Sequence, residues 1–274
     1  MPIPAVYVNG KKTFTVLENN PEVMNALALS LGLSPTLQFH DVYSLTEPSL
    51  LSLIPRPVHA LLVIIPLTSA WHADRTIEDA SHTAEHPHTC KGADDQEPIV
   101  WFKQTIGHAC GSIGLLHCLL NGAARHHLAP DSTAARIRAT ALPLGMRDRA
   151  QMLYEDQAFE DAHCAVAELG DTVAPSAEEG DRLGQHFVAF VKAGGRLWEL
   201  EGSRMGPLDR GPLAEDEDVL SQRGIALGLG RVIELEKRDA ESKGLEGGDL
   251  RFSCIALAGG GDRDVLDAGG GIVG

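Results

Sequence analysis

The sequence predicts an α/β protein, in which helices pack against a β-sheet. Residues 60–66, ALLVIIP, form a short and entirely apolar run, which is typical of a buried strand. Residues 20–32 and 110–122 repeat apolar side chains at the spacing of a helix. Residues 186–202, HFVAFVKAGGRLWELEG, contain two apolar strands around an Ala-Gly-Gly turn, the pattern of a β-hairpin.

The length of 274 residues fits one large domain or two small ones, and 43% of the residues are hydrophobic, as in an ordinary globular protein. Its longest apolar stretch is far too short to span a bilayer, and its first residues lack the features of a secretory signal. Five cysteines at irregular spacing give no disulfide framework. We therefore expect a monomer with reduced thiols in the cytoplasm, with the nucleus as a second compartment.

The formal net charge of −15 limits the classes of partner. Such a charge repels the phosphates of nucleic acids and anionic membranes, so we expect neither as a partner. It would attract a basic partner. An acidic surface that serves only solubility is the simpler interpretation of the composition alone.

The first elements of the chain follow from local signals. A helix is predicted to begin at the cap Asn20, with Pro21 at its first position, and to end at Gly32. Residues 37–42 have weak strand character, and residues 47–53 indicate a short helix before the strand at 60–66.

Residues 70–99 are polar, charged and poor in periodicity, so we expect a mobile loop there. The segment contains side chains that could suggest zinc binding, namely His72, His82, His86, His88 and Cys90. Their spacing matches no standard pattern of zinc ligands, and a solvated loop is the simpler interpretation.

The second half of the chain is predicted to alternate between helices and strands. The expected elements are helices at 110–122 and over much of 130–164, a long loop at 168–184, the hairpin at 186–202, a helix interrupted by glycines at 219–240 and a strand at 250–257. We therefore expect a single domain over residues 1–258 and a flexible, glycine-rich tail at 259–274.

The turn of the hairpin decides which side chains meet. If the two turn residues are Ala-Gly, His186 lies opposite Glu201; if they are Gly-Gly, His186 lies opposite Ser203 with Glu201 on the diagonal. Both registers put His186 and Glu201 on the same face of the sheet. A three-residue turn would put them on opposite faces.

Residues 104–122, QTIGHACGSIGLLHCLLNG, place Cys110 where a helix is predicted to begin. Unpaired N–H groups and the helix dipole favour a thiolate at such a position. A nearby imidazole such as His186 favours it further and can carry a proton. Glu201 could orient that imidazole, and the Gln104 side-chain amide, with the N–H of Cys110, could stabilise an oxyanion.

Each of these residues also has an ordinary structural interpretation. A lone cysteine is more often an inert residue of the core. A lone histidine on a strand is usually structural, and a glutamate near the end of a hairpin is usually solvated. Spacing alone therefore leaves a cysteine hydrolase as the less favoured interpretation.

The segment QTIGHACGSIGLLHCLLN resembles the active-site segment of the ubiquitin C-terminal hydrolases, which are papain-like cysteine peptidases. NPEVMNALALSLGL, FHDVYSL and LIPRPVHALLVIIP resemble the N-terminal part of that family, HFVAFVKAGGRLWELEG its histidine hairpin, and DLRFSCIAL its closing strand. The resemblance runs in order from about residue 3 to residue 257. It implies an α/β (α+β) fold with a mostly antiparallel central sheet, flanking helices and a knotted backbone.

By position, the resemblance implies that Cys110 is the nucleophile, His186 the general base and acid, Gln104 the oxyanion donor and Glu201 the residue that orients His186. Better-known members carry Asp in an E-L-D-G run where this chain has Glu201. A different rotamer could absorb the extra methylene, or the alignment of His186 could weaken. His108 also stands where many members have Asn.

The resemblance further implies that residues 168–184 cross above the active site and admit only small or unfolded leaving groups. The expected function is a thiol hydrolase that cleaves amide, ester or thioester bonds at the C-terminal glycine of ubiquitin, whose basic tail an acidic enzyme would attract. No metal or organic cofactor is needed. The alternatives are a catalytically weakened ubiquitin-binding module of the same fold, a hydrolase acting on a ubiquitin-like modifier, and a zinc-dependent hydrolase that uses the His-rich segment.

Overall fold

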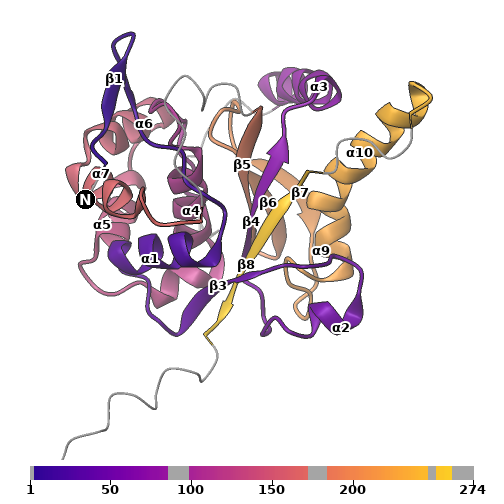
Figure 1. The fold of residues 1–274 in the computed structure, drawn as a ribbon, viewed down its shortest axis with the longest axis horizontal. Coiled ribbons are helices and arrows are strands. Elements are labelled where there is room, and N and C mark those ends of the chain that lie inside the picture. The colour runs from indigo at the N-terminus through magenta and orange to yellow at the C-terminus, as the bar shows by residue number, and fades with distance from the viewer. Residues whose placement is uncertain (1–2, 86–98, 172–183, 246–250, 261–274) are drawn as a thin grey trace, which may run out of the picture.

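The computed structural model describes residues 3–85, 99–171, 184–245 and 251–260. Its centre is a six-stranded antiparallel sheet in the order β3-β8-β4-β5-β6-β7 (Figure 1). The strands are β3 (Leu37–Asp41), β4 (Ala60–Pro66), β5 (Gln185–Ala193), β6 (Arg196–Leu200), β7 (Leu208–Pro212) and β8 (Ser253–Gly259). A separate hairpin of β1 (Val6–Val8) and β2 (Lys11–Thr13) lies outside this sheet.

Helices cover both faces of the sheet (Figure 1). On one side lie α1 (Pro21–Leu31), α4 (Cys110–Leu120), the 3-10 helix η1 (Gly122–His127), α5 (Thr133–Ala141), α6 (Met146–Glu155) and α7 (Gln157–Val166). On the other side lie α2 (Pro48–Leu51), α3 (Ser69–Glu85), α9 (Gln222–Leu227) and α10 (Leu229–Ser242). The sheet is therefore a middle layer, and alternate residues of β4, β5 and β8 enter two separate cores.

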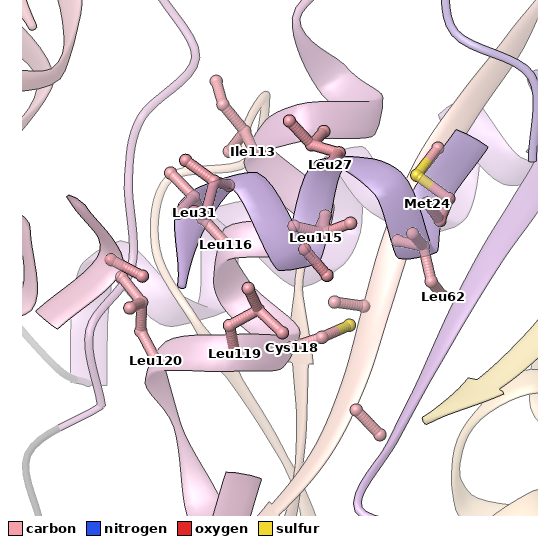
Figure 2. Close-up of a cluster of buried hydrophobic side chains, with 14 of the residues drawn as sticks. Met24, Leu27, Leu31, Leu62, Ile113, Leu115, Leu116, Cys118, Leu119 and Leu120 are labelled. Carbon is pink, nitrogen blue, oxygen red and sulfur yellow. The ribbon is translucent and has the colours of Figure 1, made fainter. Parts of the chain in front are cut away.

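The first core is built around α4, which packs between α1 and the sheet. Leu115, Leu116 and Leu119 of α4 are fully buried with Leu27 of α1 and Leu62 of β4 (Figure 2). This helix is apolar on all sides because it is covered on all sides. Its position fixes where its first residue, a cysteine, can lie.

Small residues let α4 approach the sheet closely, as the two glycines of its sequence indicate. A Cβ atom added to Gly114 would lie 2.8 Å from the side chain of Leu62, and one added to Gly111 would lie 3.2 Å from the ring of Phe187. A larger side chain at Gly114 would require the side chain of Leu62 to move. The contact brings the N-terminus of α4 to the start of β5.

The second core lies on the opposite face of the sheet. Val188 and Phe190 of β5 pack there with Val63 of β4, Leu229 of α10 and Trp71 of α3. None of the helices within the described ranges is both long and apolar enough to cross a membrane.

Most of the predicted elements are confirmed. Helix α1 begins after the cap Asn20, whose side chain accepts from Val23 N–H, and it ends at Gly32 in the left-handed conformation. The hairpin turns through Gly194 and Gly195, both with positive φ, so the register is the Gly-Gly one of the two alternatives. That register puts His186 and Glu201 on one face.

The prediction of a loop at residues 70–99 is wrong for its first part, because α3 continues to residue 85. Apolar periodicity does not reveal this helix because it carries few apolar residues. It is instead attached by ion pairs, such as those of Glu78 with Arg204 and Arg210 at 3.1 and 2.5 Å. Residues 86–98, with His86, His88 and Cys90, lie outside the described residues.

Three short strands have no counterpart among the predicted elements. β1 and β2 have only three residues each, and β7, with the sequence LDRGP, contains an Asp, a Gly and a Pro, which are depleted in strands. Most of the loop predicted at 168–184 and of the tail predicted at 259–274 lies outside the described residues.

Candidate active site

The candidate nucleophile Cys110 is the first residue of α4, as its sequence position predicts. The residue as a whole is partly exposed, but its thiol is buried between the helix start and β5, where it accepts hydrogen bonds from the backbone N–H groups of Phe187 and Gly111. The neighbouring residue His108 has a positive φ of 54°. Asn is favoured in this left-handed region, and His is among the other residues that enter it more readily than most.

The expectation that this environment favours a thiolate is wrong for this conformation. Burial raises the pKa of the Cys110 thiol to about 11, and the nearby charge of Glu201 adds to the effect. The N–H groups of Phe187 and Gly111 lower the pKa but do not outweigh the loss of solvation. The described contacts of the thiol include no hydrogen bond to the His186 imidazole. The thiol is therefore protonated at neutral pH.

His186 and Glu201 meet as the hairpin register predicts. The Nε2 atom of His186 lies 2.6 Å from Oε1 of Glu201, although the ring N–H is not aligned with that oxygen. The side chain of His186 is 12% exposed, whereas that of Glu201 is completely buried. The additional methylene of Glu201 thus still allows the contact, but with poor hydrogen-bond direction.

The carboxylate of Glu201 is charged despite its burial. Burial alone would raise its pKa, but the nearby imidazole of His186 and hydrogen bonds from Ser203 outweigh this and lower the pKa to about 2. Oε1 accepts from Ser203 N–H at 2.6 Å, and Oε2 accepts from the Ser203 hydroxyl at 2.9 Å. A buried anion with these partners has the properties required to orient an imidazole.

Gln104 lies in an extended segment beside the loop that follows β6. Its backbone N–H donates to Gly202 O at 2.8 Å, so it is tied directly to the residue after Glu201. Its side-chain Nε2 donates to Ile106 O at 3.2 Å, and its Oε1 is buried without a hydrogen-bond partner among the described residues. In this conformation the side-chain amide of Gln104 donates its hydrogen bond to the backbone of Ile106, two residues further along the chain toward Cys110.

The segment that carries Gln104 is held by α4. Asn121, at the end of α4, accepts from Val100 N–H at 2.7 Å and donates to Val100 O at 2.9 Å. His117, one turn earlier, accepts from Phe102 N–H at 3.0 Å. The side chains of Asn121 and His117 thus make the hydrogen bonds to the backbone of this segment that a neighbouring strand would otherwise make. One helix therefore fixes both the oxyanion candidate and the nucleophile candidate.

The sequence does not indicate Ser203, His117 or Asn121 as parts of the site. In the sequence, His117 falls on the apolar face of its helix and Asn121 marks only the end of that helix. Their polar partners lie far away along the chain, so the sequence pattern does not reveal these contacts. Within the described ranges, no group of His, Cys, Asp or Glu side chains is arranged to hold a metal ion.

A cysteine at a helix start, beside a strand whose histidine contacts a carboxylate, is typical of thiol hydrolases. The model of the family described as "Ubiquitin carboxyl-terminal hydrolase, family 1" matches residues 14–227 of this chain. The chain therefore belongs to the ubiquitin carboxyl-terminal hydrolases of family 1, a family of peptidases.

Individual relatives agree with this assignment. Ubiquitin carboxyl-terminal hydrolase 3 of Arabidopsis thaliana is 35% identical over 204 residues, which cover 74% of this chain and 81% of that protein. The human ubiquitin carboxyl-terminal hydrolase isozyme L1 is 31% identical over 244 residues, or 88% of this chain and 96% of that protein.

Solved structures share the fold. The catalytic domain of Trichinella spiralis UCH37, crystallised with ubiquitin vinyl methyl ester, matches with a TM-score of 0.59 and 18% identity. The match covers 90% of this chain and 95% of that one. The α/β fold with an antiparallel sheet flanked by helices, predicted from the sequence, is thereby confirmed.

Proposed function

We propose that this protein is a deubiquitinating thiol hydrolase that cleaves amide, ester or thioester bonds at the C-terminal glycine of ubiquitin. The observation that carries the proposal is the contact of 2.6 Å between His186 and the buried Glu201, because His186 lies on β5, the strand that packs against the first turn of the Cys110 helix. Membership of the family, together with the fold shared with a hydrolase crystallised with ubiquitin vinyl methyl ester, supports ubiquitin as the partner.

In the proposed reaction, the thiol of Cys110 attacks the carbonyl carbon of the glycine while His186 accepts the thiol proton. Because burial raises the pKa of the thiol to about 11, this proton transfer must accompany the attack. The oxyanion accepts hydrogen bonds from the Gln104 amide and the Cys110 N–H. His186 then protonates the leaving group, and a water molecule that it deprotonates releases ubiquitin from the sulfur.

Two contacts must change when substrate binds. The imidazole has to approach the thiol, and the amide of Gln104 has to leave Ile106 O for the oxyanion. Catalytic hydrogen bonds in ligand-free enzymes are often long and tighten only in the complex with substrate. Neither change requires a metal or an organic cofactor.

The charge of the chain supports a basic partner. The formal net charge of −15 favours association with a basic C-terminal tail and disfavours nucleic acids. We propose that the protein acts as a monomer in the cytoplasm, with the nucleus as a second compartment. The preference for small or unfolded leaving groups rests on the resemblance of residues 168–184 to the family.

The proposed function is tested with ubiquitin that carries a C-terminal fluorogenic amide. We expect the wild-type protein to release the fluorophore and Cys110→Ala to lose at least about 1,000-fold of kcat/KM. Cys164→Ala is the matched control, because Cys164 is a buried thiol on α7, outside the site. Equal turnover by wild type and Cys110→Ala would refute the assignment of the nucleophile.

A second candidate function is favoured by the poorly aligned His186 contact and the protonated thiol. Both would suit a module that binds ubiquitin but turns over slowly. The same assay separates the two, because such a module would bind ubiquitin tightly without releasing the fluorophore. A hydrolase for a ubiquitin-like modifier would instead release the fluorophore faster from the corresponding modifier amide than from ubiquitin amide.

A further inference from the structure

The carboxylate of Glu201 is held by one residue on both of its oxygens. The Ser203 N–H donates to Oε1 at 2.6 Å, and the Ser203 hydroxyl donates to Oε2 at 2.9 Å. Oε1 is also the oxygen that lies 2.6 Å from Nε2 of His186. The direction in which Glu201 meets His186 therefore depends on where Ser203 lies.

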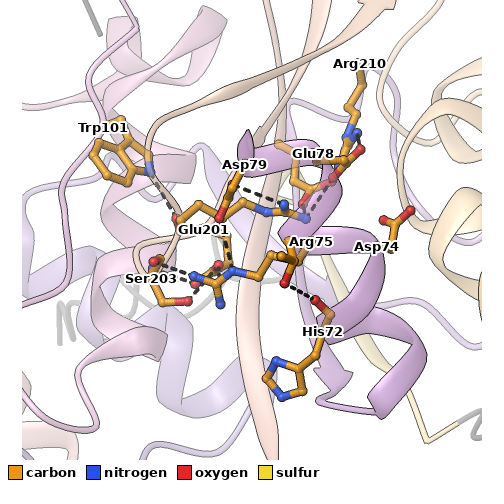
Figure 3. Close-up of polar contacts among 12 residues, drawn as sticks. His72, Asp74, Arg75, Glu78, Asp79, Trp101, Glu201, Ser203 and Arg210 are labelled. Atoms are coloured by element: carbon orange, nitrogen blue, oxygen red, sulfur yellow. Dashed lines mark hydrogen bonds and ion pairs between the residues drawn. The ribbon is translucent and has the colours of Figure 1, made fainter. Parts of the chain in front are cut away.

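Ser203 is itself fixed by two cationic side chains. Its carbonyl oxygen accepts from Nη2 of Arg75 at 2.5 Å and from Nζ of Lys103 at 2.6 Å (Figure 3 shows Arg75 beside Ser203 and Glu201). Nη1 of the same Arg75 lies 3.8 Å from Oε2 of Glu201. Arg75 thus contacts both the carboxylate and the residue that holds it.

Arg75 reaches this position from α3, on the far side of the sheet from α4. Its guanidinium lies 5.1 Å from the centre of the Trp71 ring, and its Nε lies 3.4 Å from Asp79. α3 is attached in turn to β6 and β7, because Glu78 and Glu199 both pair with Arg210, at 2.5 and 2.7 Å. The guanidinium is therefore held in place before any substrate binds.

We propose that Ser203 and Arg75 are positioning residues, which act through Glu201 to set the orientation of His186. The inference rests on the hydrolase function proposed above. A short polar residue and a planar guanidinium together locate a carboxylate that is one methylene longer than that of the better-known family members. α3 thereby has a catalytic consequence through Arg75, which reaches Ser203 and Glu201.

The experiment compares variants with the ubiquitin C-terminal fluorogenic amide as substrate. Ser203→Ala and Arg75→Gln are each expected to lower kcat about 3- to 10-fold with KM changed less than about 2-fold, because they disturb orientation and not binding. Ser203→Thr keeps the hydroxyl and should restore kcat to within about 2-fold of wild type. Arg75→Lys keeps the charge and should restore it in part.

Arg231→Gln is the matched control. Arg231 belongs to the same set of ion pairs and binds α3 through Asp74 and Glu78, each at 3.0 Å, but it contacts neither Glu201 nor Ser203. We expect its kcat to stay within about 2-fold of wild type. If Arg231→Gln lowers kcat as much as Arg75→Gln, Arg75 serves only to attach α3 to the rest of the protein, and the proposal is wrong. A change in KM alone, with kcat unaltered in Ser203→Ala and Arg75→Gln, would overturn the proposal as well.

A second readout does not depend on turnover. The NMR resonance of His186 Nε2 in protein labelled with ¹⁵N-histidine should shift in Ser203→Ala and Arg75→Gln but not in Arg231→Gln. Unshifted resonances in the first two variants would refute the positioning role. If wild type shows no turnover that depends on Cys110, the proposed function fails, while this comparison still decides the role of Ser203 and Arg75.

Discussion

Two helices flank the candidate site, and they are held in opposite ways. α4 lies in the larger core, with every residue from Gly111 to Leu120 buried (Figure 2). Among the side chains of α3 that the structure describes, Trp71 is the large apolar one in a core. Charged side chains such as Arg75 and Glu78 make further contacts with β7 and with the residues after β6 (Figure 3). The first helix carries the nucleophile candidate, and the second supports the carboxylate that faces the histidine. The comparison shows that different interactions stabilise the two halves of one site: apolar packing holds α4, and ion pairs hold α3.

The largest expected effect belongs to the core around α4. Leu116→Ala should lower the free energy of unfolding by about 2–5 kcal/mol, because it leaves a cavity in a fully buried cluster. Ile77→Ala on α3 is the control, since Ile77 is 72% exposed and its loss should cost less than about 0.5 kcal/mol. Urea unfolding at pH 7 measures both. Equal losses of unfolding free energy in the two variants would contradict the proposed difference between α4 and α3.

The next effect concerns the sulfur at the start of α4. With a pKa raised by burial to about 11, the thiolate fraction of Cys110 at pH 7.5 should be about 100-fold lower than that of an unperturbed thiol. Alkylation by iodoacetamide without substrate should be correspondingly slow and should accelerate up to about pH 11. A rate that levels off near pH 8 would contradict this description of the resting site.

Glu201 gives the site a pH-dependent stability. Its folded pKa of about 2 lies below its ordinary value of 4.5, so the carboxylate stabilises the fold above pH 4.5 and this contribution is lost as the pH falls through 2. Glu201→Gln should cost roughly 1–3 kcal/mol at pH 7 and little near pH 2. The exposed Glu241→Gln is the control. A cost for Glu201→Gln that is the same at both pH values would show that charge is not its origin.

The smallest effect is expected for the outer ion pairs of α3. Arg231→Gln should lower the free energy of unfolding by less than about 1 kcal/mol, because its partners Asp74 and Glu78 are partly exposed. Raising NaCl from 0.05 to 1 M should reduce this difference further, since the Debye length falls to about 3 Å. A loss of several kcal/mol would mean that α3 depends on this arginine as strongly as α4 depends on its leucines.

The same contrast explains what could be predicted from the sequence. α4, β4 and the hairpin follow from apolar periodicity and from a Gly-Gly turn, and the turn also brings His186 to Glu201. The helix α3 and the contacts of Arg75 could not be predicted from the sequence, because ion pairs between residues far apart in sequence leave no periodic signal. The raised pKa of Cys110 also could not be read from the sequence, since it depends on how deeply the thiol is buried.

One reaction tests the proposed chemistry most directly. Ubiquitin that carries an electrophile at its C-terminus is incubated with the wild-type protein, and the modified residue is mapped by peptide mass spectrometry. We expect a single covalent adduct on Cys110, which is lost in Cys110→Ala and retained in Cys164→Ala. An adduct on any of the other four cysteines of the chain, or no adduct at all, would contradict the assignment of Cys110 as the nucleophile.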